Sequence, residues 1–363
     1  MNEDCLKLTS YFGERDRTGD ELVADALLDL YGRHQLQTSV LLRGVEGFGA
    51  HHRLRTDRLL TLSEDLPVVS VAVDTRERVI AVLDEVLAIK RRGLITLERA
   101  RMLTGELDGV VLAQELHEAT KLTMYVGRRA RIAGRPAFVA ICELLFERGL
   151  DGATVLLGVD GTAHGARQRA RFIASNADVP MMIIAVGSGE RIAAVLPELD
   201  VMLDRPLATL ERLRVCKRDG ELLARPAEVS PQDEAGLPVW QKLMVYSSER
   251  ATHGGSPIHV AIVRALRERG ASGATCLRGI WGFHGDARPH GDRLLQLRRR
   301  VPVVTVVVDA PDRIGAWFDV IDGITSERGL VTSELVPAAV APEQSPHSAE
   351  IRLARPKPRG DQP

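Results

Sequence analysis

The sequence is poor in aromatic residues and cysteines, and it contains no long apolar run. Phe, Trp and Tyr make up 4% of the chain, which gives little support to a sheet that stacks RNA bases on exposed aromatic side chains. The four cysteines lie apart, without a CxxC pair or clustered histidines, so we expect a reduced protein without a metal site. No run of about 18 apolar residues is present, so no membrane-spanning helix is predicted.

The charges nearly cancel, with 48 Lys and Arg against 49 Asp and Glu, and so give no reason to expect nucleic acid or an anionic membrane as partner. The first residues, MNEDCLKLTS, lack the basic and apolar segments of a secretory signal, so a cytoplasmic location is predicted. No GxSxG, HExxH or P-loop motif occurs, and Glu64-Asp65 is an acidic pair in one copy of a repeated loop that the other copies lack. We therefore expect a protein that is not an enzyme.

Three blocks of sequence recur in the same order along the chain. The first reads KLTSYFG, KLTMYVG and KLMVYSS, beginning at Lys7, Lys121 and Lys242. The second reads SVLLRGVEGFG, TVLLGVDGTAH and TCLRGIWGFHG, and the third reads LPVVSVAVD, VPMMIIAVG and VPVVTVVVD. The glycines that mark the second block (Gly44, Gly158, Gly279) are spaced like the lysines, so the chain consists of three tandem copies of one small domain.

Each copy has the pattern β-α-β-β-α-β. In the first copy, Lys7, Thr9 and Tyr11 alternate with their neighbours as in a strand, and apolar residues over 22–30 follow one helical face. The VLLRG segment and residues 68–73 are the next strands, followed by a helix over 78–91 and a strand over 94–101. This order predicts an α+β fold of three ferredoxin-like modules, each with two helices on one face of an antiparallel sheet.

The third strand of each copy is apolar on both faces, although helices cover only one. Packing of the three sheets against one another, as an intramolecular pseudo-trimer, would bury the second face. The predicted organisation is module 1 (1–104), a linker (105–118), module 2 (119–218, the most diverged copy), a flexible linker (219–239), module 3 (240–340) and a disordered, Pro-rich basic tail (341–363).

The segments LLRGVEGFGA and LTLSEDLPVV resemble the domain-of-unknown-function family 190, a group of PII-like signalling proteins, and the likeness extends over nearly the whole chain. Copy three keeps Arg278-Gly279 and Gly282-Phe283, whereas copy two has Leu157 in place of the arginine and VDGTAHG in place of the turn. The resemblance implies a PII-like fold, trimeric packing, and nucleotide or oxoacid ligands in clefts between subunits. It also implies a loop that reports occupancy to a transporter, channel or enzyme, with bacterial fluoride-exporting channels as candidate partners.

The segment after the second strand is the candidate ligand site. Its glycines let the backbone turn sharply toward a ligand, and the planar fork of arginine donates two hydrogen bonds to a phosphate or carboxylate. Two arginines keep their register in every copy (Arg53, Arg167 and Arg288; Arg58, Arg171 and Arg293). The predicted ligand-binding residues are Arg43, Gly44, Gly47, Phe48, Gly49, Arg53, Arg58, Arg278, Gly279, Gly282, Phe283, Arg288 and Arg293. A tight turn followed by solvated arginines is the alternative interpretation.

Two further patterns are interpreted differently. His51-His52 point to opposite faces of an extended segment and lack counterparts in the other copies, so no metal site is predicted. Lysines and tyrosines that recur on one face of the first strand favour packing between sheets over ligand binding (Lys7, Lys121, Lys242, Tyr11, Tyr125, Tyr246).

The sequence thus predicts a monomeric chain that binds a small anionic ligand, with an adenine nucleotide as one candidate, between its modules. Through its loops it would regulate a transporter, channel or enzyme. No cofactor, metal or nucleic acid is expected. The alternatives are a ligand-free scaffold that docks on a membrane transporter, such as a fluoride channel, and an enzyme that acts on a phosphorylated metabolite.

Overall fold

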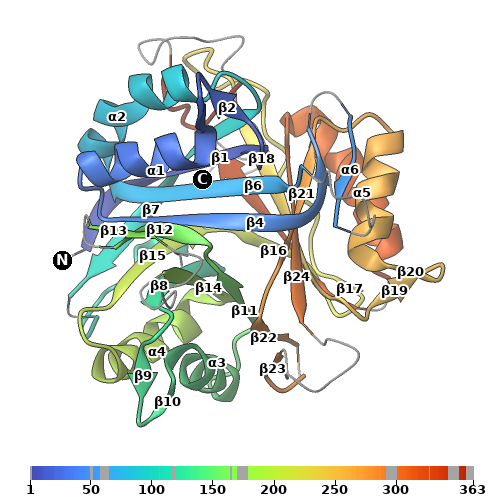
Figure 1. Cartoon of the computed structure of the whole chain (residues 1–363). Coiled ribbons are helices and arrows are strands. Elements are labelled where there is room, and N and C mark those ends of the chain that lie inside the picture. The colour runs from blue at the N-terminus through green and yellow to red at the C-terminus, as the bar shows by residue number, and fades with distance from the viewer. Residues whose placement is uncertain are drawn as a thin grey trace.

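The computed structural model describes residues 2–49, 52–57, 65–105, 107–116, 119–163, 166–169, 179–285, 287–291, 301–326, 328–341 and 351–356. Strands form the interior of the molecule and the helices lie on its outside (Figure 1).

Each copy of the repeat folds into one module with the same succession of main strands and helices. Module 1 contains β1 (Asn2–Gly13), β2 (Arg17–Thr18), β3 (Glu21–Leu22), α1 (Val23–Arg33), β4 (Thr38–Phe48), β5 (Arg55–Thr56), β6 (Pro67–Thr75), α2 (Arg76–Ile89) and β7 (Leu94–Thr104). Module 2 contains β8 (Thr120–Gly127), β9 (Arg131–Ile132), β10 (Arg135–Pro136), α3 (Ala137–Glu147), β11 (Gly152–Leu157), β12 (Asp160–Ala163), β13 (Ala166–Arg169), β14 (Pro180–Gly187), α4 (Gly189–Met202), β15 (Leu207–Arg212) and β16 (Arg214–Arg218). Module 3 contains β18 (Trp240–Ser248), β19 (Thr252–His253), β20 (Ser256–Pro257), α5 (Ile258–Glu268), β21 (Ala274–Arg278), β22 (Trp281–His284), β23 (His290–Gly291), β24 (Pro302–Asp309), α6 (Pro311–Ile324), β25 (Leu330–Val336) and β26 (Ala338–Val340).

The four main strands of every module are joined in the same antiparallel order. This order is β4–β6–β1–β7 in module 1, β11–β14–β8–β15 in module 2 and β21–β24–β18–β25 in module 3. The helix pairs α1–α2, α3–α4 and α5–α6 occupy three separate sides of the strands (Figure 1). The protein is therefore a mixed α/β fold of three repeated modules on a curled antiparallel sheet. No helix in the described ranges is long and apolar enough to cross a membrane.

The third strand of each module is buried on both faces, as its apolar sequence requires. In β6, Val68 and Ala72 face the core under the helices of module 1. Val69, Val71 and Val73 point the other way, into a core to which all three modules contribute. The third strands of modules 2 and 3 supply Met182, Ile184, Val186, Val304, Val306 and Val308 to this shared core. Packing between modules therefore covers the second face of the sheets.

Strand pairs connect each module to both of the others. The second strand continues as β12 after β11 in module 2 and as β22 after β21 in module 3. Among these strands, β4 pairs with β21, β22 pairs with β11, and β12 pairs with β4. Among the last strands, β7 pairs with β15, β16 with β25, and β26 with β7. Backbone hydrogen bonds thus close a circuit of three modules within one chain.

The connecting segment between modules 1 and 2 is packed against module 2. Leu107, Leu112 and Leu116 are buried in the core of that module, and a short 3-10 helix, η1 (Gln114–Leu116), ends the segment.

Part of the predicted disordered tail is ordered. Ala354 is fully buried with Val229 and Val239 from the connection between modules 2 and 3, which also contains β17 (Glu221–Leu222). The Ala354 amide donates to the Pro337 carbonyl at 2.8 Å, and the Arg99 guanidinium donates to the Ala354 carbonyl at 2.8 Å. The prediction of disorder is therefore wrong for residues 351–356, because these backbone groups find partners in modules 1 and 3.

Candidate functional site

The glycines of the predicted ligand loops lie where strands of two modules meet. A Cβ atom on Gly47 of β4 would come within 2.6 Å of the Ala274 carbonyl oxygen in β21. A Cβ atom on Gly282 of β22 would come within 2.2 Å of the Ala153 carbonyl oxygen in β11. A Cβ atom on Gly44 or on Gly279 would likewise come about 2.9 Å from a backbone oxygen of the neighbouring module, whereas a Cβ atom on Gly49 would have no described atom beyond its chain neighbours within 4 Å. The close backbone approach that the glycines permit is thus made by a strand of the next module.

Module 2 keeps the same arrangement, although its loop sequence has diverged. Gly158 and Gly161 occupy the positions of Gly44 and Gly47, and a Cβ atom on Gly161 would come within 2.3 Å of the Ser39 carbonyl oxygen. Copy two therefore keeps glycines at both of these positions, although VDGTAHG replaces the glycine–phenylalanine–glycine turn. Pairing between modules, which every copy needs, accounts for their retention.

Phe48 and Phe283 anchor their strands in the core of the neighbouring module. Phe48 of module 1 is buried in the core of module 3, and Phe283 of module 3 is buried in the core of module 2. The Phe283 ring lies edge-on to Phe146, with ring centroids 5.3 Å apart. In module 2 the equivalent residue is Thr162, whose hydroxyl is 2.8 Å from that of Ser39 in module 1. Packing between modules explains these side chains without a ligand.

Arg43 and Arg278 form ion pairs at the positions where the sequence predicts anion binding. The guanidinium of Arg43 makes a two-fold hydrogen bond with Glu14, at 2.8 and 2.9 Å. The guanidinium of Arg278 contacts Asp57 of module 1 at 3.1 Å and Glu249 of its own module at 2.8 Å. Arg278 therefore bridges two modules. Its Nε is buried and has no hydrogen-bond partner in the described part of the chain.

Module 2 lacks the glutamate–arginine pair that module 1 makes with Glu14 and Arg43 and module 3 makes with Glu249 and Arg278. Glu14 and Glu249 each follow the first-strand lysine by seven residues, and Arg128 stands at that position in module 2. Leu157 stands at the position of Arg43 and Arg278, the arginines that pair with these glutamates in modules 1 and 3. Both members of the pair are thus substituted together, which makes the module boundaries chemically unequal.

The other predicted site residues are exposed or lie outside the described ranges. Arg53 and Arg288 are exposed. Arg58, Arg171, Arg293 and His51 lie outside the described residues, as does the side chain of Arg167. The His52 ring stacks on Phe48 with centroids 5.9 Å apart, so it has a packing contact.

Six charged side chains form a buried ring at the centre of the molecule, which we call the lysine–glutamate ring. Its members are Lys7, Lys121, Lys242, Glu98, Glu211 and Glu334. Within each module the lysine and glutamate are direct cross-strand partners, with Nζ–Oε2 distances of 3.0, 3.2 and 2.9 Å. Each lysine also binds the glutamate of another module: Lys7 binds Glu211, Lys121 binds Glu334, and Lys242 binds Glu98. The ring therefore alternates in charge and passes once through every module.

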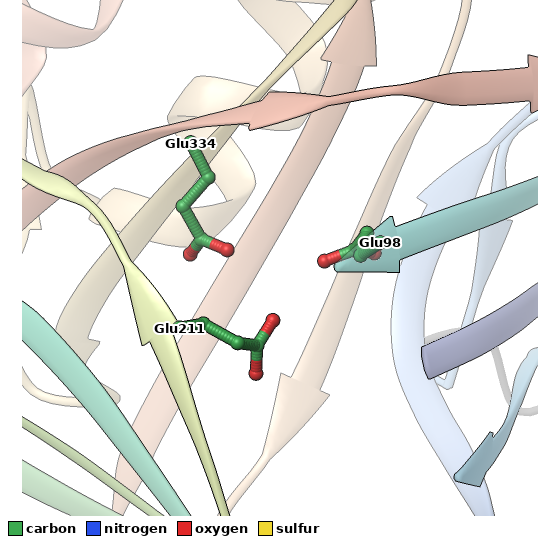
Figure 2. Close-up of side chains that lie close together, drawn as sticks. All are labelled: Glu98, Glu211 and Glu334. Atoms are coloured by element: carbon green, nitrogen blue, oxygen red, sulfur yellow. The ribbon is translucent and has the colours of Figure 1, made fainter. Parts of the chain in front are cut away.

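The three carboxylates of the ring converge from β7, β15 and β25 (Figure 2). Their closest oxygens all lie within 4.8 Å of one another, a spacing that could hold a metal ion. However, an ammonium group already lies between each neighbouring pair, so the negative charge is balanced without a metal. An ion-pair ring fits the donor set better than a cation site.

Burial and ion pairing shift the pKa values of the ring residues in opposite directions. Burial by itself raises the pKa of the Glu98 carboxyl, but Lys242, Lys7 and Lys121 hold this pKa well below its ordinary value. Burial lowers the pKa of Lys7, and the surrounding carboxylates more than offset it and raise this pKa well above the ordinary value. For Lys121 burial dominates and the pKa is lowered. The ring is thus held by mutual neutralisation of charges that are almost completely buried.

Next to the ring is an apolar chamber of about 50 Å³. Leu42, Leu156 and Leu277, one from the second strand of each module, contribute to its wall. Organic ligands usually occupy pockets of roughly 300–1,000 Å³, so the chamber is too small for a nucleotide. A nucleotide-sized ligand must bind elsewhere.

Sequence reasoning assigned the first-strand lysines to sheet packing but missed their carboxylate partners. The signal was present, because TLER at 96–99, TLER at 209–212 and TSEL at 332–335 place a glutamate at the same position of each last strand. One carboxylate per lysine in three copies indicates charge pairing.

Comparison with known proteins agrees with the repeat. The model of the family DUF190, described as uncharacterized ACR, COG1993, matches residues 5–102, 119–215 and 240–338. The chain therefore belongs to this family, with three tandem copies of its domain. It is also similar to a UPF0166 protein of Aquifex aeolicus (strain VF5), with 32% identity over 92 residues, which cover 25% of this chain and 86% of that protein. The relative thus corresponds in size to a single module.

Proposed function

We propose that this chain is a PII-like regulatory protein that binds a small anionic ligand where its modules meet and reports binding through the adjoining loops. The observation that carries the proposal is Arg278. It extends from module 3 to Asp57 of module 1, and its sheltered Nε lacks a protein partner in the described part of the chain. A ligand that accepts from this Nε would bind both modules at once.

The proposal includes an intramolecular pseudo-trimer of ferredoxin-like modules. The shared strand order, the two circuits of strand pairs and the lysine–glutamate ring all support pseudo-threefold packing. In such an arrangement a ligand between two modules changes their relative position, which is a direct way to convert binding into a signal.

The boundaries should differ in affinity. The pairs Glu14–Arg43 and Glu249–Arg278 are both present, and module 2 has Arg128 and Leu157 instead. A single chain permits such divergence because each copy mutates independently. We expect fewer than three ligands per chain.

A ligand-free scaffold is the second candidate, and the ion pairs favour it. Carboxylates already occupy the fork of Arg43 and the NH groups of Arg278. An anion must displace them, whereas a protein partner could dock on the exposed parts of the loops. The partner of such a scaffold would be a transporter, channel or enzyme.

A thermal-shift screen against ATP, ADP, AMP, cyclic AMP, 2-oxoglutarate and fluoride tests the proposal. A ligand at a hundred times its dissociation constant stabilises the folded state by about 2.7 kcal/mol, which raises the melting temperature measurably. In the variant Arg43→Ala/Arg278→Ala we expect binding to weaken at least several-fold, because a charge-assisted hydrogen bond contributes about 1.5–3 kcal/mol.

The matched control is Arg135→Ala/Arg148→Ala, which removes two arginine–carboxylate pairs within module 2 and away from the boundaries. The control should bind as the wild type does. Equal affinity in the boundary variant and the control would reject the site. A wild-type protein that responds to none of these ligands would favour the scaffold.

A further inference from the structure

We propose that residues 351–356 form a strap that closes the junction between modules 3 and 1 and allows this junction to open separately from the other two. The strap is bound by both modules. Its Ala354 amide donates to the carbonyl of Pro337, which follows β25 of module 3, at 2.8 Å. The guanidinium of Arg99, in β7 of module 1, donates to the carbonyls of Leu353 and Ala354 at 3.2 and 2.8 Å.

The connection between modules 2 and 3 provides a third attachment. The Arg355 amide donates to the Asp233 carboxylate at 2.8 Å. The same carboxylate accepts from the amides of Ala235 and Leu237, each at 2.9 Å, so it orders its own turn and the strap together. The backbone donors, Arg355 first, lower the pKa of Asp233, which keeps this acceptor ionised at neutral pH.

Apolar side chains of the strap are covered on two sides. Ala354 is fully buried with Val229 and Val239 of the connection between modules 2 and 3. Ile351 and Leu353 pack against the core that lies under the helices of module 1. Detachment of the strap would return this surface to water, so burial favours the closed arrangement.

The order of the modules explains why this junction needs a strap. Modules 1 and 2 are consecutive in the chain, as are modules 2 and 3, whereas modules 3 and 1 are not. The last-strand pairing is also shortest here, because β26 pairs with β7 over three residues, and β15 with β7 and β16 with β25 over four. The strap therefore supplies at this junction the packing that a covalent connection supplies at the other two.

The charges around Arg99 weaken its hold on the strap. Burial and the neighbouring charges of Arg76 and Arg355 lower the pKa of Arg99, and Asp233 opposes them. Two of these cations repel the guanidinium that binds the strap carbonyls. We therefore expect this junction to open at a lower free-energy cost than the two junctions with a covalent connection.

Opening of the strap would release one of the two strand contacts between modules 3 and 1. It would free β26 from β7, while β4 and β21 would keep the modules joined through their second strands. Modules 3 and 1 would then move about the remaining contact as about a hinge.

Hydrogen exchange of the full-length chain, followed by mass spectrometry, tests the proposal. The variant Ala354→Glu places a charge at the fully buried position of the strap. We expect peptides that contain residues 351–356 or β26 to exchange at least tenfold faster than in the wild type, and peptides from β16 and β25 to change less than twofold. The control Ala81→Glu makes the same substitution at an exposed position of α2 and should leave all of these peptides unchanged.

A second variant, Arg99→Ala, removes the guanidinium that binds the strap and adds no charge to the buried position. The same peptides should exchange faster in this variant. Unchanged exchange of β26 in either variant overturns the proposal. Equal acceleration in β16 and β25 overturns it as well, because the whole molecule would then have loosened. No ligand takes part in this experiment, so its outcome is independent of the proposed function.

Discussion

At the scale of single residues, the main feature is a set of six buried charges that neutralise one another. Each of the lysine and glutamate side chains in the ring is at most 7% exposed. The favourable interaction between two buried charges roughly offsets the loss of hydration, so a complete ring adds little net stability. Removal of one member is different, because it leaves an uncompensated charge in the interior.

Glu98→Gln should therefore strongly destabilise the protein. The substitution keeps the shape of the side chain but leaves Lys7 and Lys242 with one carboxylate fewer. Breaking a buried ion pair costs about 3–5 kcal/mol in the free energy of unfolding, which urea denaturation at pH 7 would measure. The control Glu143→Gln removes the exposed partner of Arg135 and should have little effect.

Acid titration gives a second readout of the same variant. The pKa of Glu98 is well below its ordinary value of 4.5 in the folded state, so its stabilising effect is fully present above pH 4.5. That effect is lost as the pH falls through the lower folded-state pKa. The difference between wild type and Glu98→Gln should shrink toward acid pH, and a constant difference would argue against an electrostatic origin.

At the scale of elements, the second strand of each module joins its neighbour through two glycines. Strand β4 bends past β21 with an irregular register between Cys276 and Leu277, and the Phe48 side chain at its end enters the core of module 3. The glycine–phenylalanine motif is thus explained by backbone crowding and by a buried anchor. In module 3 the arginine of the motif, Arg278, keeps an Nε donor that has no partner among the described residues.

Gly47→Ala should weaken the junction between modules 1 and 3. The new Cβ would lie 2.6 Å from the Ala274 carbonyl oxygen, so one of the two paired backbones would have to shift. Overpacking of this kind costs about 1–3 kcal/mol in the free energy of unfolding. Gly49→Ala is the matched control, because no described atom beyond its chain neighbours lies within 4 Å of its added Cβ. Equal stability of the two variants would show that the junction can relax.

At the scale of the whole molecule, all pairings between modules are made within one chain. Both circuits of strand pairs and the ring close without a second copy. The shared core is likewise complete, since its members are almost entirely buried in a single chain.

We expect the protein to be monomeric. Light scattering at dilute concentration should give a mass near 39.7 kDa, because the surfaces that would join separate modules are already used within the chain. A mass about three times larger would show that the strand circuits close between chains instead.

The sequence by itself determined the number of modules, the succession of their elements and the double-sided burial of the third strands. Each of these depends on local periodicity repeated three times, and the apolar runs leave no other way to bury their side chains. It also predicted that the first-strand lysines lie between sheets. Their partners could have been found in the same way, from the glutamate that recurs in each last strand.

Only the tertiary structure decided what the loop residues contact. A glycine permits close approach of either a ligand or another strand, and the tertiary structure decides which of them lies next to it. In this molecule Gly47 lies next to the backbone of Ala274, a residue far away in the chain. The same holds for Arg278, whose partner Asp57 is 221 residues away. Contacts of this kind depend on which residues of different modules come to lie side by side when the three modules close into one circuit, and the local sequence does not specify that register.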